Sequence, residues 1–122
     1  MNMDSKTTIE DIKKLIKDHC TARDWDQFHN AKDLSIGIIT EASELLEHFR
    51  WKNPKEVEEI MHNPKTRLEV SEEMADVLYF LGRLAERYNI DLSEEFFRKM
   101  EKNEKKYPVE KAKGSNKKYN EL

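Results

Sequence analysis

Four long segments of this 122-residue chain carry apolar residues at the three- and four-residue spacing of an α-helix, and this periodicity constrains the fold most strongly. No run alternates apolar and polar residues for long enough to form a strand, and only three glycines and three prolines interrupt the sequence. We therefore predict an all-α protein of the four-helix-bundle type. The helices are expected at about residues 8–22, 32–50, 66–89 and 93–106, with a shorter helical piece at 54–64.

Capping signals and prolines delimit the predicted helices. Thr7 and Glu10 have the spacing of a capping box at the start of the first helix. Pro108 stops the fourth helix because proline cannot continue the hydrogen-bond pattern. We expect residues 1–110 to form one helical domain and residues 111–122, rich in lysine, to form a basic, solvated tail.

Composition excludes several classes of protein. No stretch approaches the roughly 18 apolar residues of a membrane span, and no signal peptide is recognisable, so we expect a cytoplasmic protein without a membrane partner. The 25 acids and 22 Lys or Arg residues give a net charge of −3, which argues against nucleic-acid binding. The single cysteine, Cys20, cannot form an internal disulfide or a thiolate zinc site.

Two of the predicted helices carry a pair of acids at the same place relative to their apolar stripes. Glu41 and Glu73 each lie about 20° outside the stripe, and Glu44 and Asp76 lie about 60° further out. If the two helices pack antiparallel, as their short connection favours, equal offsets bring the four carboxylates to one edge. Carboxylates so close repel one another unless a cation lies among them. We therefore expect a hard divalent ion there, Mg²⁺ with Mn²⁺ as a substitute.

Other interpretations of these acids stay open. Acids three residues apart are frequent on solvated helix surfaces in a chain with 25 acids, and only the repeated offset weighs against that interpretation. A di-iron site would need Glu-x-x-His on two helices, and no two helices here carry it. His48, one turn after Glu44, is either a further ligand or a helix-end histidine favoured by the helix dipole.

Aromatic and basic side chains accompany the acids. Four aromatic residues lie before and after the second predicted helix: Trp25, Phe28, His29 and Trp51. Each can stack on a nucleobase or serve as a core residue. Three polar residues recur along the fourth predicted helix: Lys99, Asn103 and Lys106. Together with a divalent ion, such groups bind a nucleotide polyphosphate. No P-loop or GxGxxG is present, so helix side chains would have to hold the nucleotide.

The sequence resembles the all-helical nucleoside triphosphate pyrophosphohydrolases related to MazG, and within them the dCTP pyrophosphatase group. The resemblance rests on E-x-x-E at 41–44 followed by E-x-x-D at 73–76, on the segment RDWDQFH at 23–29, on EHFRW at 47–51 and on YPV at 107–109. It extends over about residues 20–120, nearly the whole chain.

This resemblance implies a magnesium-dependent hydrolase that converts dCTP or a modified dCTP to the monophosphate and pyrophosphate, cleans the nucleotide pool, and forms a homotetramer built from dimers. The implied metal ligands and catalytic residues are Glu41, Glu44, Glu73 and Asp76. The implied substrate-binding residues are Trp25, Phe28, His29, Trp51, Phe80, Lys99, Asn103 and Lys106. Ile16, Phe80 and Lys106 stand where family members carry a histidine, a tyrosine and an arginine, respectively.

Two further functions stay open from the sequence. One is a non-catalytic helical module that binds a nucleotide for regulation or interaction. The other is a sibling pyrophosphohydrolase that acts on a different nucleotide. Trp25 and Trp51 favour a base-stacking pocket over a site for a phosphoribosyl intermediate.

Overall fold

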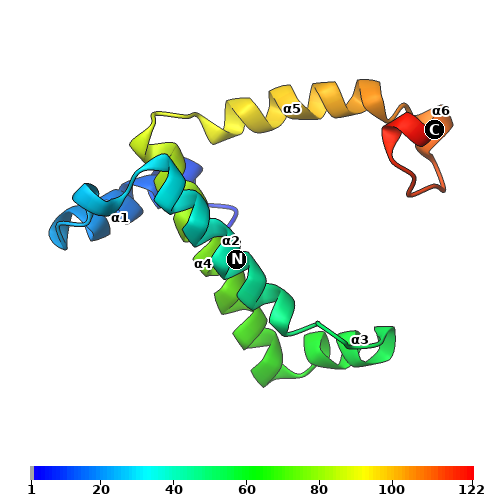
Figure 1. The fold of residues 1–122 in the computed structure, drawn as a ribbon, viewed down its shortest axis with the longest axis horizontal. Coiled ribbons are helices and arrows are strands. Elements are labelled where there is room, and N and C mark those ends of the chain that lie inside the picture. The colour runs from blue at the N-terminus through cyan, green and yellow to red at the C-terminus, as the bar shows by residue number, and fades with distance from the viewer. Residues whose placement is uncertain (1) are drawn as a thin grey trace. The chain divides into compact units, whose positions relative to one another are not determined.

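The computed structural model describes residues 2–122, and these residues contain no β-strand. The first part of the chain holds α1 (Ile9–Ala22), the 3-10 turn η1 (Asp26–Phe28), α2 (Ala31–Glu47), α3 (Pro54–His62) and α4 (Pro64–Arg87). The helices α5 (Leu92–Lys106) and α6 (Val109–Ala112) and the 3-10 turn η2 (Tyr119–Glu121) follow (Figure 1). The predicted all-α class is confirmed. No helix in the described part of the chain has the length and apolar character needed to cross a membrane.

The chain divides into two compact units, one ending at Asn89 and the other beginning at Ile90. In the first unit, α2 and α4 run antiparallel and side by side, and α1 and α3 each contact α4 (Figure 1). This is the orientation expected for the two acid-bearing helices. The second unit holds α5, α6 and η2. The predicted domain boundary at residue 110 stays a prediction.

Asparagine-proline pairs begin two helices of the first unit. The Asn53 side chain accepts a hydrogen bond from the Glu56 N–H at 2.9 Å, and Pro54 occupies the first turn of α3. Asn63 and Pro64 do the same for α4. Proline fits a first turn because the N–H that it lacks would have no intrahelical partner there. Two capped helices, α3 and α4, therefore meet at Asn63.

The start of the first helix corrects one prediction. Thr8 and Asp11 form the capping box, with the Asp11 N–H donating to Thr8 Oγ1 at 3.0 Å and the Thr8 N–H donating to Asp11 Oδ2 at 2.9 Å. We predicted Thr7 and Glu10, one residue earlier. Both pairs have the spacing that a capping box requires, so the local sequence did not distinguish them.

The end of α2 corrects another prediction, because the helix stops at Glu47 and not at residue 50. The Phe49 N–H donates to the Leu46 carbonyl at 2.9 Å, a three-residue hydrogen bond that tightens the chain beyond the helix. Trp51 then adopts a φ of 65°, in the left-handed region that residues other than glycine seldom occupy. A right-handed helix cannot pass through that conformation.

The segment predicted as a solvated tail is largely exposed but contains short helical pieces. The Pro108 carbonyl accepts hydrogen bonds from the N–H groups of Lys111 and Ala112, at 3.0 and 2.9 Å, which forms α6. Composition alone did not reveal this turn, because a proline that ends one helix can also begin the next.

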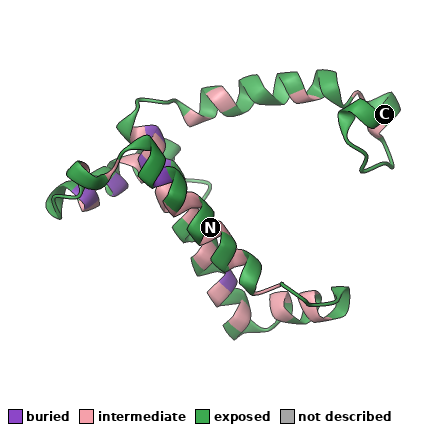
Figure 2. Cartoon of the chain, in the orientation of Figure 1, coloured by how far each residue is buried: buried purple, intermediate pink, exposed green. Residues whose placement is uncertain are grey.

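The buried core of the first unit is thin and comes from α1, α2 and α4 (Figure 2). Its apolar members are Ile16, Cys20, Leu34, Val70 and Ala85. Many large apolar side chains of α2 and α4 stay exposed, among them Ile36, Ile39, Leu46, Leu68, Met74 and Leu78. Apolar helix faces of this size are unfavourable in contact with water. In a single chain, part of the apolar surface of α2 and α4 therefore stays exposed to solvent.

Gly37 allows α2 and α4 to approach closely. A Cβ there would lie 2.5 Å from Phe80 Cδ1 and 2.9 Å from Phe80 Cγ, so the whole ring would have to turn or the two helices would have to separate. We expect Gly37→Ala to lower the free energy of unfolding by about 1 kcal/mol, because overpacking costs about 1–3 kcal/mol and helix propensity returns about 1. Gly82→Ala is the control, since its Cβ would meet only the terminal Cδ1 of Ile16. Urea unfolding that finds position 37 no more sensitive than position 82 would contradict this expectation.

Candidate functional site

Three carboxylates meet where α2 and α4 run side by side. Glu41 projects from α2, and Glu73 and Asp76 project from α4. One oxygen of each lies within 4.8 Å of an oxygen of the others. The antiparallel pairing of two amphipathic helices thus brings together acids that are more than thirty residues apart in sequence, as the matching offsets predicted.

Glu44 joins this group through Glu41. Glu44 lies three residues after Glu41 on α2, so the two carboxyl groups project from neighbouring positions of one helix face. Burial raises the pKa of Glu41 above its ordinary value, and the hydrogen bond to Glu44 and the negative charges of Glu44, Asp76 and Glu73 raise it further. Glu41, Glu73 and Asp76 thus share one site, and the charge of Glu44 acts on it through Glu41. Their mutual repulsion is the electrostatic condition that a bound cation relieves.

Glu73 carries the most informative atom of the site. Its Oε2 is buried and has no hydrogen-bond partner among the described residues, whereas its Oε1 lies 3.6 Å from His48 Nε2. A buried carboxylate oxygen without a partner is costly, and a hard cation satisfies it. The donor set is made of carboxylate oxygens, which suits Mg²⁺ or Mn²⁺ better than a soft metal. The residues present therefore fit a divalent cation.

The raised pKa of Glu41 predicts how the metal-free protein responds to pH. Because the folded pKa lies above the ordinary 4.5, the folded state binds this proton more tightly than the unfolded chain does. The resulting stabilisation is complete below about pH 4.5 and is lost as the pH rises through the folded pKa. Glu41→Gln, which cannot ionise at this position, should not show this loss of stability as the pH rises. Melting temperatures measured in chelator across that range should diverge between the two proteins, and parallel curves would refute the assignment.

The aromatic residues before α2 gather against α1 and α4. The Trp25 ring lies 5.5 Å from the His19 ring and 6.1 Å from the His29 ring, centroid to centroid. The Tyr79 ring lies 5.7 Å from His19, and the predicted site residue Phe80 lies 5.4 Å from Tyr79. The structure thus brings three predicted residues into one aromatic group and adds His19 and Tyr79.

Sequence reasoning did not place His19 and Tyr79 beside the predicted aromatic residues. The Tyr79 hydroxyl lies 3.0 Å from His19 Nδ1 and 2.9 Å from Cys20 Sγ, between α1 and α4. Both residues fall among helical apolar positions, where a histidine or tyrosine also serves as an ordinary core side chain. A polar aromatic on the inner face of each of two helices was the one signal that could have indicated their contact.

Two other predicted aromatics do not join this group. Phe28 is exposed, and Trp51 lies beyond the opposite end of α2 from Trp25. The 17 residues of α2 span about 25 Å, so a single chain cannot stack both indoles on one base. Trp51 is 87% exposed and contacts the Arg50 guanidinium, 5.0 Å from its ring centroid.

The predicted phosphate-binding residues lie in the second unit. Lys99, Asn103 and Lys106 all belong to α5, and Asn103 is half-buried. The Lys106 ammonium lies 4.7 Å from the centroid of the Tyr119 ring, a cation–π contact within that unit. Their proposed role toward a substrate stays a prediction.

Comparison with known proteins adds independent information. The model of the MazG-like family matches residues 36–122. The chain is 37% identical over 118 residues to dCTP pyrophosphatase 1 of Bos taurus, covering 97% of this chain and 70% of the relative. It is 38% identical over 115 residues to dCTP pyrophosphatase 1 of Homo sapiens, covering 94% and 68%. A crystal structure of a pyrophosphatase from Archaeoglobus fulgidus superimposes with a TM-score of 0.76 at 39% identity, covering 82% of this chain and 92% of that one.

Proposed function

Because the chain belongs to the MazG-like family, we propose that it is a nucleoside triphosphate pyrophosphohydrolase acting on dCTP or a modified dCTP. The products are the monophosphate and pyrophosphate. The observation that carries the proposal is the group of Glu41, Glu73 and Asp76, with the unpartnered Glu73 Oε2 among them. Such a group has no use in holding the fold together, because like charges repel.

The three acids of this group and Glu44, which follows Glu41 on α2, have two tasks. Glu41, Glu44, Glu73 and Asp76 hold one or more Mg²⁺ ions, for which Mn²⁺ can substitute. A bound divalent cation neutralises phosphate oxygens and polarises the phosphorus. One carboxylate orients the attacking water and accepts its proton. Water adds at the α-phosphorus and the bond from that phosphorus to the bridging oxygen breaks, which releases pyrophosphate.

The remaining residues bind the substrate. Lys99, Asn103 and Lys106 contact the phosphates and offset the charge that develops in the transition state. Trp25 and His29 lie on the base side, and Phe80 forms an apolar wall near the sugar. Phe80 offers no partner to a ribose 2′-hydroxyl, and burying a hydroxyl without a partner costs about 1–3 kcal/mol. We therefore expect a deoxyribonucleotide to be preferred.

A homo-oligomer, a tetramer built from dimers, completes the proposal. Trp25 and Trp51 can enclose one base only if they come from different copies, because α2 separates them within one chain. The exposed apolar residues of α2 and α4, and a shallow groove of about 440 Å³ lined by residues such as Leu45, Phe49 and Met61, offer surface for such contacts. Trp51 is exposed and has a left-handed φ of 65°, and backbone strain of this kind is typical of residues held for function.

A substrate panel tests the proposed function. Pyrophosphate release is measured with dCTP, CTP, dTTP, dUTP and dATP, with Mg²⁺ and with chelator. We expect dCTP to have the highest kcat/KM, exceeding CTP by about 5- to 150-fold for the unpartnered hydroxyl, and no release in chelator. Binding of dCTP without release would instead indicate a non-catalytic nucleotide-binding module. A higher kcat/KM for another base would indicate a sibling enzyme.

A further inference from the structure

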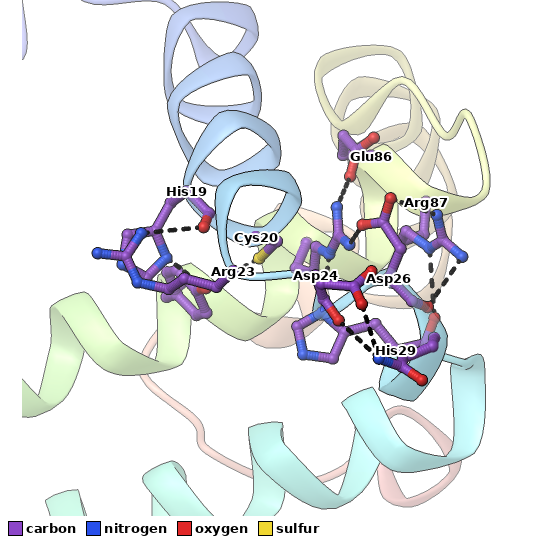
Figure 3. Close-up of polar contacts among 11 residues, drawn as sticks. His19, Cys20, Arg23, Asp24, Asp26, His29, Glu86 and Arg87 are labelled. Atoms are coloured by element: carbon purple, nitrogen blue, oxygen red, sulfur yellow. Dashed lines mark hydrogen bonds and ion pairs between the residues drawn. The ribbon is translucent and has the colours of Figure 1, made fainter.

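Arg83 is fully buried. Among the described residues, no other charged side chain is buried in this way. It lies on α4 and donates to three acceptors, on the residues Asp26, His29 and Glu86 that Figure 3 labels. Nη1 donates to Glu86 Oε2 at 2.6 Å, Nη2 donates to the carboxylate of Asp26, and Nε donates to His29 Nδ1 at 2.9 Å. A guanidinium buried in this way requires all of these acceptors, so the arrangement of η1 against α4 is fixed by it.

The contact with His29 determines which nitrogen of that imidazole carries the proton. An arginine has N–H donors and no acceptor, so His29 Nδ1 must be the accepting nitrogen. A neutral imidazole then holds its hydrogen on Nε2, which has no hydrogen-bond partner among the described residues. If Nδ1 were protonated, its N–H would face the N–H of Arg83 Nε, and no hydrogen bond could form between them. Burial lowers the pKa of His29, and the positive charges of Arg83 and Arg87 lower it further, against the opposing charge of Asp26.

The fixed imidazole stands beside a stacking surface. The Trp25 ring lies 6.1 Å from the His29 ring, and the two residues flank η1. Arg83 holds this segment, residues 25–29, against α4 through Asp26 and His29. An indole face can stack on any base, whereas a single N–H in a fixed direction selects a base edge that presents an acceptor. The two groups together form a surface for a flat ring with a hydrogen-bond acceptor on one edge.

We propose that Arg83 is a positioning residue for substrate recognition, which holds His29 as a neutral Nε2–H donor to an acceptor on the pyrimidine edge of the substrate. The assignment of the acceptor rests on the proposed function; the tautomer of His29 does not. A pyrimidine offers such an acceptor at its O2 carbonyl, and cytosine offers a second at its unprotonated N3. Arg83 itself touches no substrate and acts through the imidazole.

Arg87 provides a matched control. It lies one turn after Arg83 and contacts the same segment, but it donates to the backbone carbonyls of His29 and Asp26, each at 3.3 Å, and pairs with the Asp26 carboxylate at 3.9 Å. It makes no contact with the imidazole ring among the interactions of the described residues. Arg87→Met therefore loosens the segment and leaves the His29 tautomer as it is.

Nitrogen-15 NMR of His29 and steady-state kinetics with dCTP test the proposal in the wild-type protein and in three variants, Arg83→Met, Arg83→Lys and Arg87→Met. We expect Nε2–H to dominate in the wild type and in Arg87→Met. In Arg83→Met the tautomers should mix, the His29 pKa should rise, and KM for dCTP should rise about 10-fold with kcat within about threefold of wild type. Arg83→Lys keeps the buried positive charge but loses the planar guanidinium with its several N–H donors. Its tautomer ratio and its KM for dCTP should lie between those of the wild type and Arg83→Met.

The control outcomes separate the possible failures. If Arg83→Met does not fold by circular dichroism, Arg83→Lys carries the test. An unchanged His29 tautomer in a folded Arg83 variant, or an equal rise of KM in Arg87→Met, overturns the positioning role. If the wild type releases no pyrophosphate from any nucleotide, the proposed function fails, while the NMR result still decides whether Arg83 sets the tautomer.

Discussion

Asp76→Asn and Glu73→Gln are each expected to lower kcat by more than about 100-fold, because both remove a carboxylate from the group that holds the cation and handles the attacking water. Neither change should harm the fold. The acids repel one another in the metal-free protein, so neutralising one of them relieves repulsion. The exposed Asp76 can be changed without opening a cavity.

Ligand-linked stability provides a second readout for these variants. A cation that binds only the folded state raises the melting temperature, and this rise should disappear in Asp76→Asn and Glu73→Gln. Glu72→Gln is the matched control, because Glu72 is an exposed acid on the same helix, outside the group. We expect it to keep both the activity and the response to Mg²⁺. Near-normal kcat in both site variants would remove the acids from the mechanism.

Trp25→Ala and Trp51→Ala are expected to raise KM for dCTP by about 5- to 150-fold each, since a lost base-stacking contact costs about 1–3 kcal/mol. The two variants should partly restore each other's activity when they are combined in one oligomer. If Trp25 of one copy and Trp51 of another share a base, an oligomer that contains both variants has sites with both indoles intact. In a twofold-related pair, about half of the sites should regain wild-type KM.

Co-expression of the two variants with different tags, followed by purification on both tags, isolates the mixed oligomer. Its mass, measured by light scattering, should equal a whole number of chains of 14.6 kDa plus the masses of their tags. Trp25→Phe is the conservative control and should retain most of the affinity, because phenylalanine still stacks. A mixed oligomer of confirmed composition that shows only the raised KM would place the two tryptophans in separate sites.

Local sequence determined the helices and their boundaries to within a few residues. Asn53 with Pro54 and Asn63 with Pro64 begin helices through contacts within one turn, and Asp91 caps α5 by accepting from the Glu94 N–H at 2.9 Å. Such contacts depend only on near neighbours, so spacing alone predicts them. The errors were of the same local kind, as in the choice between Thr7 and Thr8.

Periodicity also determined the acid group, because the angular place of a residue on a helix follows from its number. Glu41 and Glu73 share an offset from their apolar stripes, and only one further assumption, antiparallel packing, was needed to bring them together. Periodicity did not predict that Glu73 Oε2 is buried without a hydrogen-bond partner among the described residues. Burial of a single atom depends on every side chain around it, and periodicity does not specify these.

Tertiary structure alone decided the contacts of Arg83. Its partner His29 is 54 residues away in sequence and its partner Asp26 is 57 residues away, both in a connector without helical periodicity. Tertiary structure likewise separated Trp25 from Trp51, which the sequence pattern had grouped around one base. Helix faces repeat along the chain and can be counted from a sequence. The path of a connector is set by long-range packing, because only burial against another element can select one backbone course among the many that a short polar segment allows.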